Sequence, residues 1–143
     1  MTDAFDLARF LDAQNPIYPR VMAELSAGQK RSHWIWFIFP QVAGLGHSAM
    51  AQRYAIGSRA EAEAYLAHPL LGARLQECTA AVLAHADKSA HQIFGSPDDI
   101  KFRSSMTLFE QVGGDPIIGQ AINRFYNGQR DRATLDILAS WPN

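Results

Sequence analysis

The chain has 143 residues, of which 48% are hydrophobic and 19% are charged, and its formal net charge is −1. This length predicts one domain, 1–143, which can bury a hydrophobic core without disulfides or metals. Because no large field of one sign exists, we expect neither nucleic acid nor a membrane surface as a partner.

Cysteine usage and the N-terminal sequence indicate the compartment. Cys78 is the single cysteine, so an internal disulfide is impossible and a reducing compartment fits. Residues 1–6 lack the basic and apolar regions of a signal peptide. The longest apolar run, 34–40, is far shorter than the ~18 residues that span a bilayer. We therefore expect a cytoplasmic protein.

Two helices are predicted at the start of the chain. Asp3 is placed to cap a helix that ends at Pro16, because proline disfavours helical backbone in the residue before it. Residues 18–27 repeat the helical spacing of apolar side chains, and Gly28 is a typical helix stop.

The next stretch, 32–39, reads Ser-His-Trp-Ile-Trp-Phe-Ile-Phe and holds two of the three tryptophans. Its continuous aromatic and β-branched residues are typical of a buried strand. Ser32 as an N-cap and Pro40 as a stop favour a short helix instead. No partner strand is evident, so we predict a buried helix, with the strand as the alternative.

Four further segments show helical signals before residue 96. Residues 48–55 read as helix, and Ser58 with Glu61 forms a capping-box pattern for a helix that stops before Pro69. Residues 69–85 carry one continuous apolar stripe and predict the most secure long helix. Residues 89–94 form a short helix or turn.

Three start signals follow. Ser96 and Pro97 open a helix that runs to about residue 112, Asp115 precedes another first-turn proline, and Asp131 caps the last helix. Together these segments predict an all-α, mainly helical, single compact domain of eight or nine short helices, which is not a simple four-helix bundle. A small two-stranded element is left open.

The helix 97–112 carries polar residues suited to holding an anion. Asp98, Lys101 and Ser105 are spaced i, i+3, i+7 beside its apolar stripe, and Arg103 and Ser104 lie on the other flank. Lysine, arginine and serine all donate hydrogen bonds to oxygen, so this set is a candidate ligand site. A partly solvated Asp98–Lys101 ion pair is the alternative explanation.

Polar residues also border the tryptophan-rich stretch. Ser32 and His33 precede it and Gln41 follows it. Histidine titrates near neutrality, so His33 is a candidate general base, whereas a purely structural histidine is the alternative. Trp34 and Trp36 are candidates for stacking on a planar ligand, with core packing as the alternative.

No metal or cofactor is expected. The other histidines show no spacing with cysteine or carboxylates that is typical of a metal site. The glycines at 44 and 46 follow no strand and lack a third glycine, so they indicate a turn and not a phosphate loop.

Two long stretches carry a resemblance. The first runs from Lys30 to Gln41 and continues through 44–48, 54–56 and 64–72; the second runs from Ile93 to Phe109. The chain resembles the bacterial domain-of-unknown-function family 1810, whose members are sometimes labelled calpastatin-like. This resemblance implies a small, mainly helical, single-domain cytoplasmic protein and no established activity or catalytic residues. A calpastatin-type inhibitor is disordered, whereas this chain is patterned to pack a core.

Two functions are compatible with these residues. In the first, the protein is an enzyme or binder of a small anionic ligand, with a nucleotide-like ligand as one candidate. The tryptophans stack, the cations and serines of 97–112 hold the anion, and His33 or Asp98 moves a proton. This requires that the tryptophan-rich stretch and the helix 97–112 face one cavity. In the alternative, the protein is a non-catalytic interaction module or a homo-oligomer. Whether it is an enzyme at all is open.

Overall fold

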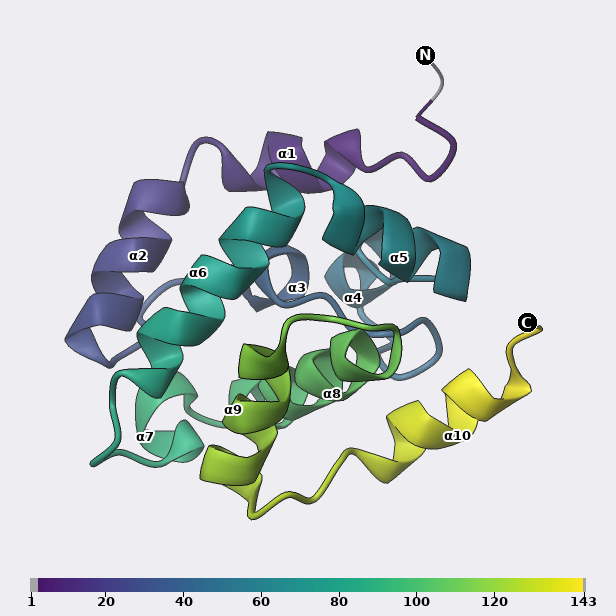
Figure 1. Cartoon of the computed structure of the whole chain (residues 1–143). Helices are drawn as coiled ribbons and strands as arrows, with labels where there is room; N and C mark the ends of the chain where they lie inside the picture. The colour runs from purple at the N-terminus through teal and green to yellow at the C-terminus, as the bar shows by residue number, and fades with distance from the viewer. Residues whose placement is uncertain (1–2, 143) are drawn as a thin grey trace.

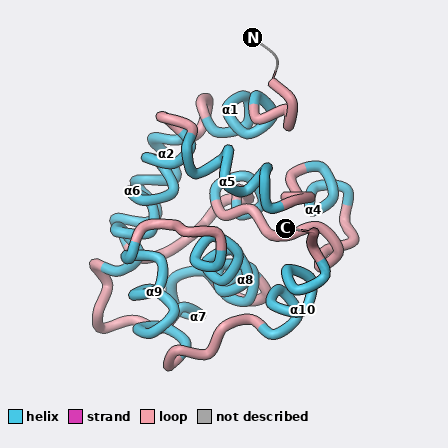
Figure 2. Tube along the Cα trace, turned by 45° about the vertical axis from the view of Figure 1, so that its right-hand side comes forward, coloured by secondary structure: helices cyan, strands magenta, loops and turns pink. Residues whose placement is uncertain are grey.

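The computed structural model describes residues 3–142, which form ten helices joined by short loops (Figure 1). In chain order these are α1 (Ala8–Gln14), α2 (Tyr18–Ala27), α3 (Ile35–Ile38), α4 (Ala49–Arg53), α5 (Arg59–Ala67), α6 (Leu71–Leu83), α7 (Ala90–Phe94), α8 (Asp98–Gln111), α9 (Pro116–Tyr126) and α10 (Arg132–Ser140). The expected all-α fold is confirmed, with slightly more helices than expected. Figure 2 shows helices and loops without a strand in these residues, and Val42 and Ile56 form an isolated parallel bridge.

Helix α8 is the central element of the fold. Seven of its residues are buried, namely Phe102, Ser104, Ser105, Met106, Thr107, Leu108 and Phe109. These positions cover every face of the helix, as expected for an element surrounded by others. Helices α3, α5, α7, α9 and α10 all contact it, and in Figure 1 it lies behind α9. The arrangement is therefore not a four-helix bundle. No helix in residues 3–142 has the length and apolarity needed to cross a membrane.

The tryptophan-rich stretch supplies the aromatic centre of the core. Phe39 is fully buried, and its ring centroid lies 4.8 Å from that of Phe102 and 6.0 Å from that of Phe94. Trp34 packs beside it at 6.3 Å. Such tilted and edge-on aromatic pairs add to the stabilisation that comes from burial alone. The residues of this stretch therefore join α3 to α7 and α8.

The stretch is helical over one turn only. Helix α3 has four residues, and Trp34 occupies its N-cap position without a side-chain hydrogen bond to the helix. The prediction of a helix is correct in type, but the proposed N-cap, Ser32, was wrong. Its hydroxyl instead donates to Glu24 Oε2 over 2.6 Å. The backbone leaves the helical region at Phe39, immediately before Pro40.

Of the other predicted helix starts, two are confirmed and the one at Ser96 is wrong. Asp115 and Asp131 accept hydrogen bonds from the amides of Ile117 and Thr134, as predicted. Helix α8 begins after Pro97, which occupies the N-cap position without a side-chain cap, so the Ser96 cap was wrong. The two acidic residues in its first turn, Asp98 and Asp99, still interact favourably with the positive end of the helix dipole.

The capping box predicted at Ser58 is only half formed. The Ser58 hydroxyl accepts from the Glu61 amide over 3.1 Å. The Glu61 carboxylate accepts from the Gly57 amide and from Arg9 instead of returning to Ser58. A long-range ion pair therefore replaced the local contact, because the Arg9 guanidinium from α1 reaches this carboxylate at 2.7 Å.

Candidate ligand-binding site

Glu24 fixes the segment that leads into α3. The residue is 8% exposed and lies near the end of α2. Oε1 accepts from the amides of Arg31 at 2.7 Å and Ser32 at 3.1 Å and from the indole N–H of Trp34 at 2.9 Å. Burial alone would raise the pKa of Glu24, but the hydrogen bonds from Ser32, Arg31 and Trp34 outweigh it and lower the pKa to about 2. Glu24 is thus an anion at neutral pH, and it positions Ser32 and Trp34.

Lys30 connects this segment to the start of α8. Its Nζ lies 2.7 Å from Asp98 Oδ2 and donates to the Ser32 carbonyl oxygen over 2.6 Å. The same ammonium lies 5.0 Å from the ring centroid of Trp34, which is within the range of a cation–π contact. The Lys30 side chain is only 6% exposed, so its charge is largely compensated by Asp98 inside the protein.

Lys101 makes a parallel connection one turn into α8. Its Nζ lies 3.8 Å from Asp98 Oδ1 and 5.2 Å from the ring centroid of Trp36. The Asp98 carboxylate therefore lies between two ammonium groups, and each ammonium also faces a tryptophan. The structure thus brings together Trp34, Trp36, Asp98 and Lys101, which the sequence placed in two separate candidate sets.

A cavity of about 390 Å³ has Trp34 in its wall, and we call it the Trp34 cavity. It is lined by Ala13, Pro16, Ile17, Arg20, Ser32, His33, Trp34 and Phe37. Three predicted site residues, Ser32, His33 and Trp34, therefore share one cavity. Its lining includes no residue of α8, so this cavity does not meet the expectation that both candidate sets face one space.

Sequence reasoning missed three residues of this region. Arg20 comes from α2 and lines the Trp34 cavity. Glu24 and Lys30 organise the tryptophan-rich segment through contacts with Trp34 and Asp98. From the sequence, Lys30 was named only as the start of the first stretch of resemblance. No local sequence pattern indicated these three residues. The side chains that they contact, or with which they share a cavity, come from other segments of the chain.

Arg103 and Ser104 lie away from this region and hold the start of α10. Arg103 donates to the carbonyl oxygens of Gln129 at 2.8 Å and Arg130 at 3.1 Å. The Ser104 hydroxyl donates to the Ile100 carbonyl oxygen and to Asp131 Oδ2. Both side chains thus have structural partners, and the structure does not bring them together with the tryptophans.

Gln41 and Ser105 occupy different surroundings. Gln41 lines a smaller cavity of about 150 Å³ beside α4, and its carbonyl oxygen accepts from the Ile56 amide. Ser105 is fully buried in α8, and its hydroxyl has no hydrogen-bond partner among the described residues. Among residues 3–142, no group of three or more histidine, cysteine or acidic side chains is placed to hold a metal ion.

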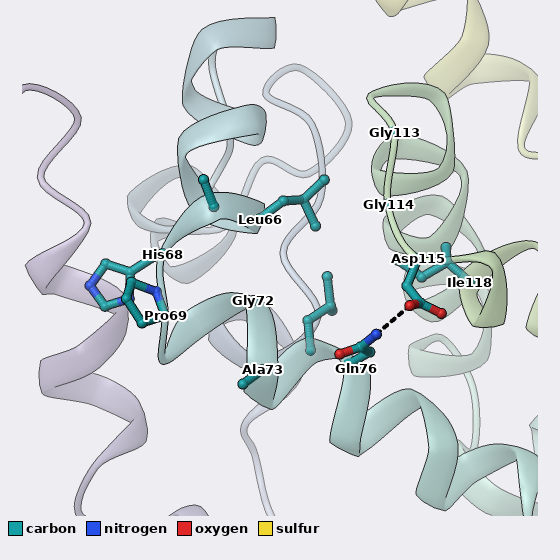
Figure 3. A pocket seen from close by; sticks show the side chains of 12 residues that line it. Leu66, His68, Pro69, Gly72, Ala73, Gln76, Gly113, Gly114, Asp115 and Ile118 are labelled. Carbon is teal, nitrogen blue, oxygen red and sulfur yellow. Dashed lines mark hydrogen bonds between the residues drawn. The ribbon is translucent and has the colours of Figure 1, made fainter.

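A further cavity of about 370 Å³ lies between the α5–α6 and α8–α9 connections (Figure 3). Its polar side chains form hydrogen bonds within the protein. Gln76 donates to Asp115, which also caps α9. The imidazole of His68 points away from the Gly113–Asp115 side in Figure 3, and its Nδ1 accepts from the amides of Leu70 and Leu71. None of the predicted site residues lines this cavity.

Comparisons with known proteins agree with this architecture. The crystal structure of the conserved hypothetical protein Rv1873 from Mycobacterium tuberculosis superposes with a TM-score of 0.94 at 50% sequence identity, covering 96% of this chain and 99% of that chain. No match was found among curated proteins. The family described as "Protein of unknown function (DUF1810)" matches residues 4–138. The chain therefore belongs to the DUF1810 family.

Proposed function

We propose that this protein binds a small organic anion in the Trp34 cavity. The observation that carries the proposal is the pair of cationic or potentially cationic side chains, Arg20 and His33, that line a mostly apolar cavity. Within residues 3–142, neither side chain forms an ion pair. Lys30 and Lys101 differ in this respect, because both already face Asp98.

The size and lining of the cavity suit a compact ligand. A volume of about 390 Å³ falls within the usual range of small-molecule sites, roughly 300–1,000 Å³. Ile17, Trp34 and Phe37 provide apolar walls for the body of the ligand. The Arg20 guanidinium can bind a carboxylate or phosphate with two parallel hydrogen bonds. Apolar walls and one cationic edge together favour an organic acid.

The wall formed by Ser32 and Trp34 is fixed before any ligand binds. Glu24 holds the Ser32 amide, the Ser32 hydroxyl and the Trp34 indole, so this wall needs little ordering on binding. Trp34 is 1% exposed and Lys30 lies over its ring, so it acts as a wall and not as an open platform for a nucleobase. This favours a compact acid over a nucleotide.

Binding alone is proposed, without a reaction. His33 lines the cavity, but the second proton-transfer candidate, Asp98, is not among the lining residues, and Lys30 holds its carboxylate at 2.7 Å. A single histidine leaves a general acid–base mechanism without its second group.

The buried Cys78 fits a reducing compartment, so we propose that this binding takes place in the cytoplasm.

A thermal-shift screen tests the proposal. The panel pairs small aromatic and aliphatic carboxylates with their uncharged amides and adds sugar phosphates and nucleotides. A ligand at 100 times its dissociation constant should stabilise the fold by about 2.7 kcal/mol.

Two substitutions test the residues involved. Arg20→Ala and His33→Ala should each weaken binding about tenfold, as expected for a lost charged hydrogen bond. Arg132→Ala makes the same charge change at a side chain that is 85% exposed in α10 and should leave binding unchanged. A flat screen would refute the proposal.

The interaction module or homo-oligomer remains the alternative. In residues 3–142, the large hydrophobic side chains that are clearly exposed are Leu70, at 41%, and Ile100, at 57%. Stable interfaces bury roughly 800 Å² on each partner, so these two side chains offer little of the apolar area required. Size-exclusion chromatography with light scattering would decide, and a stable dimer would favour the alternative.

A further inference from the structure

The cavity of Figure 3 is lined by one acidic side chain, Asp115, and we call it the Asp115 cavity. Among residues 3–142, no lysine or arginine lines this cavity, and Asp115 forms no ion pair. His68 supplies no positive charge in this arrangement, because its Nδ1 accepts hydrogen bonds from two amides and therefore carries no proton. The lining thus carries net negative charge.

Asp115 and Gln76 offer acceptor oxygens to this cavity. The Asp115 carboxylate accepts from the Ile117 amide and from Gln76 Nε2, so two of its roughly four lone-pair positions are used. Because a carboxylate can only accept, it fixes the Gln76 amide with its nitrogen towards Asp115. Figure 3 shows this hydrogen bond, with the Gln76 oxygen on the side away from Asp115. Within residues 3–142, that oxygen has no hydrogen-bond partner.

Several backbone donors around the cavity are already used by the fold. The amides of Gly113 and Gly114 donate to carbonyl oxygens in the last turn of α8, and the Ile118 amide donates to the Asp115 carbonyl oxygen. The positive end of α9 offsets part of the Asp115 charge, because Asp115 caps this helix, but it brings no cationic side chain. A ligand that supplies both hydrogen-bond donors and positive charge therefore complements this lining.

We infer that the Asp115 cavity binds a small primary amine in its protonated form. The ammonium group, which has three donors and no acceptor, pairs with the Asp115 carboxylate and donates to Gln76 Oε1. Leu66, Pro69 and Ile118 provide apolar walls for the alkyl part. The volume of about 370 Å³ falls within the usual range of small-molecule sites, roughly 300–1,000 Å³. Asp115 and Gln76 are exposed, so entry requires no movement of the backbone. The cavity shares no residue with the Trp34 cavity, so this inference stands independently of the proposed function.

The amide signals of Gly113 and Gly114 in a ¹H–¹⁵N spectrum of the full chain provide the test, because both residues line the cavity. n-Butylammonium chloride is titrated at constant ionic strength, with 1-butanol as the uncharged probe of similar size and sodium butyrate as the anionic one. We expect butylammonium to move both signals saturably. 1-Butanol should bind about fivefold more weakly, as expected for the loss of an exposed ion pair, and butyrate should leave both signals unchanged.

Three variants locate the binding. Asp115→Asn removes the charge but keeps an oxygen for the Ile117 amide, so the cap of α9 is retained and butylammonium binding should weaken about fivefold. Asp131→Asn makes the same change at the cap of α10, outside the cavity, and should leave binding unchanged. Ala73→Leu fills the cavity from the exposed face of α6 without changing its charge, and it should abolish the response.

Three results would overturn the inference. The first is an equal response to 1-butanol and butylammonium, or to sodium chloride alone, because the amine would then have no specific role. The second is an equal loss of affinity in Asp115→Asn and Asp131→Asn, which would indicate a general effect of surface charge. The third is an undiminished response in Ala73→Leu. Because Arg20→Ala alters only the Trp34 cavity, butylammonium binding that survives this substitution separates the two sites.

Discussion

The indole N–H of Trp34 donates to Glu24 Oε1 across 2.9 Å, and this hydrogen bond ties α2 to the tryptophan-rich stretch. The carboxylate accepts from the Arg31 and Ser32 amides as well. In Glu24→Gln an amide replaces the anion, so the three hydrogen bonds to Oε1 become neutral ones, and an amide nitrogen in place of Oε2 cannot accept from the Ser32 hydroxyl. We expect the free energy of unfolding to fall by about 2–3 kcal/mol, measured by urea denaturation.

Glu77→Gln is the matched control for this substitution. Glu77 lies on the exposed face of α6, and its carboxylate contacts the Tyr18 hydroxyl at the surface. The same change of charge there should alter stability by less than about 0.5 kcal/mol. Equal losses in both variants would show that the Glu24 hydrogen bonds have no special stabilising role.

The pH dependence of stability should report the same carboxylate. The folded-state pKa of Glu24 is lowered to about 2 from an ordinary value of 4.5, so its stabilisation is complete above pH 4.5. That stabilisation is lost as the pH falls from 4.5 towards 2, because the unfolded state then binds the proton more strongly. The stability difference between the wild type and Glu24→Gln should therefore shrink over this window, as urea titrations at each pH would show. A constant difference down to pH 2 would contradict the assignment.

These contacts show which features the sequence could predict. The caps Asp115 and Asp131 were predictable because a cap and its amide lie within one turn of chain. The Lys30–Asp98 pair was not, because its partners belong to distant segments that only the fold brings together. The same reason applies to Ser32. Its position before an apolar run predicted a hydrogen bond to the helix amides, whereas its hydroxyl donates to Glu24 of α2.

At Arg103, local reasoning predicted a ligand contact, whereas the structure shows contacts within the protein. Its position beside the apolar stripe of α8 suggested an anion contact, yet its guanidinium donates to two carbonyl oxygens before α10 and lies 5.7 Å from the ring of Tyr126. A sequence shows that arginine carries five donors but not which acceptors reach them.

Arg103→Ala should destabilise the protein without weakening binding in the Trp34 cavity. The loss of two hydrogen bonds from a charged group predicts about 2 kcal/mol, with increased hydrogen exchange in α10. Arg132→Ala, in an exposed pair with Asp136, should cost less than about 0.5 kcal/mol. A loss of ligand affinity at unchanged stability would instead restore the ligand-binding role that the sequence suggested.

Cys78 should be inert in the folded protein. Its thiol is fully buried, and burial raises its pKa to about 12, so almost no thiolate exists at neutral pH. A thiol reagent such as 5,5′-dithiobis(2-nitrobenzoic acid) should react only after unfolding, with one equivalent released in denaturant. Rapid reaction of the native protein at pH 8, at the rate of a free thiol, would contradict this burial.

Gly72, in the first turn of α6, should be hard to replace. A Cβ atom there would lie 2.2 Å from the Leu66 carbonyl oxygen, and backbone cannot move aside as a flexible side chain can. Because α5 and α6 must separate to admit a methyl group, Gly72→Ala should cost about 3 kcal/mol in urea denaturation. At Gly57 the new Cβ would meet only Glu61 Oε1 at 3.6 Å, an ordinary contact. Gly57→Ala should therefore be neutral or stabilising by up to about 1 kcal/mol, through the lower entropy of its unfolded chain. Equal tolerance at both positions would show that the close approach of Gly72 to Leu66 does not constrain the fold.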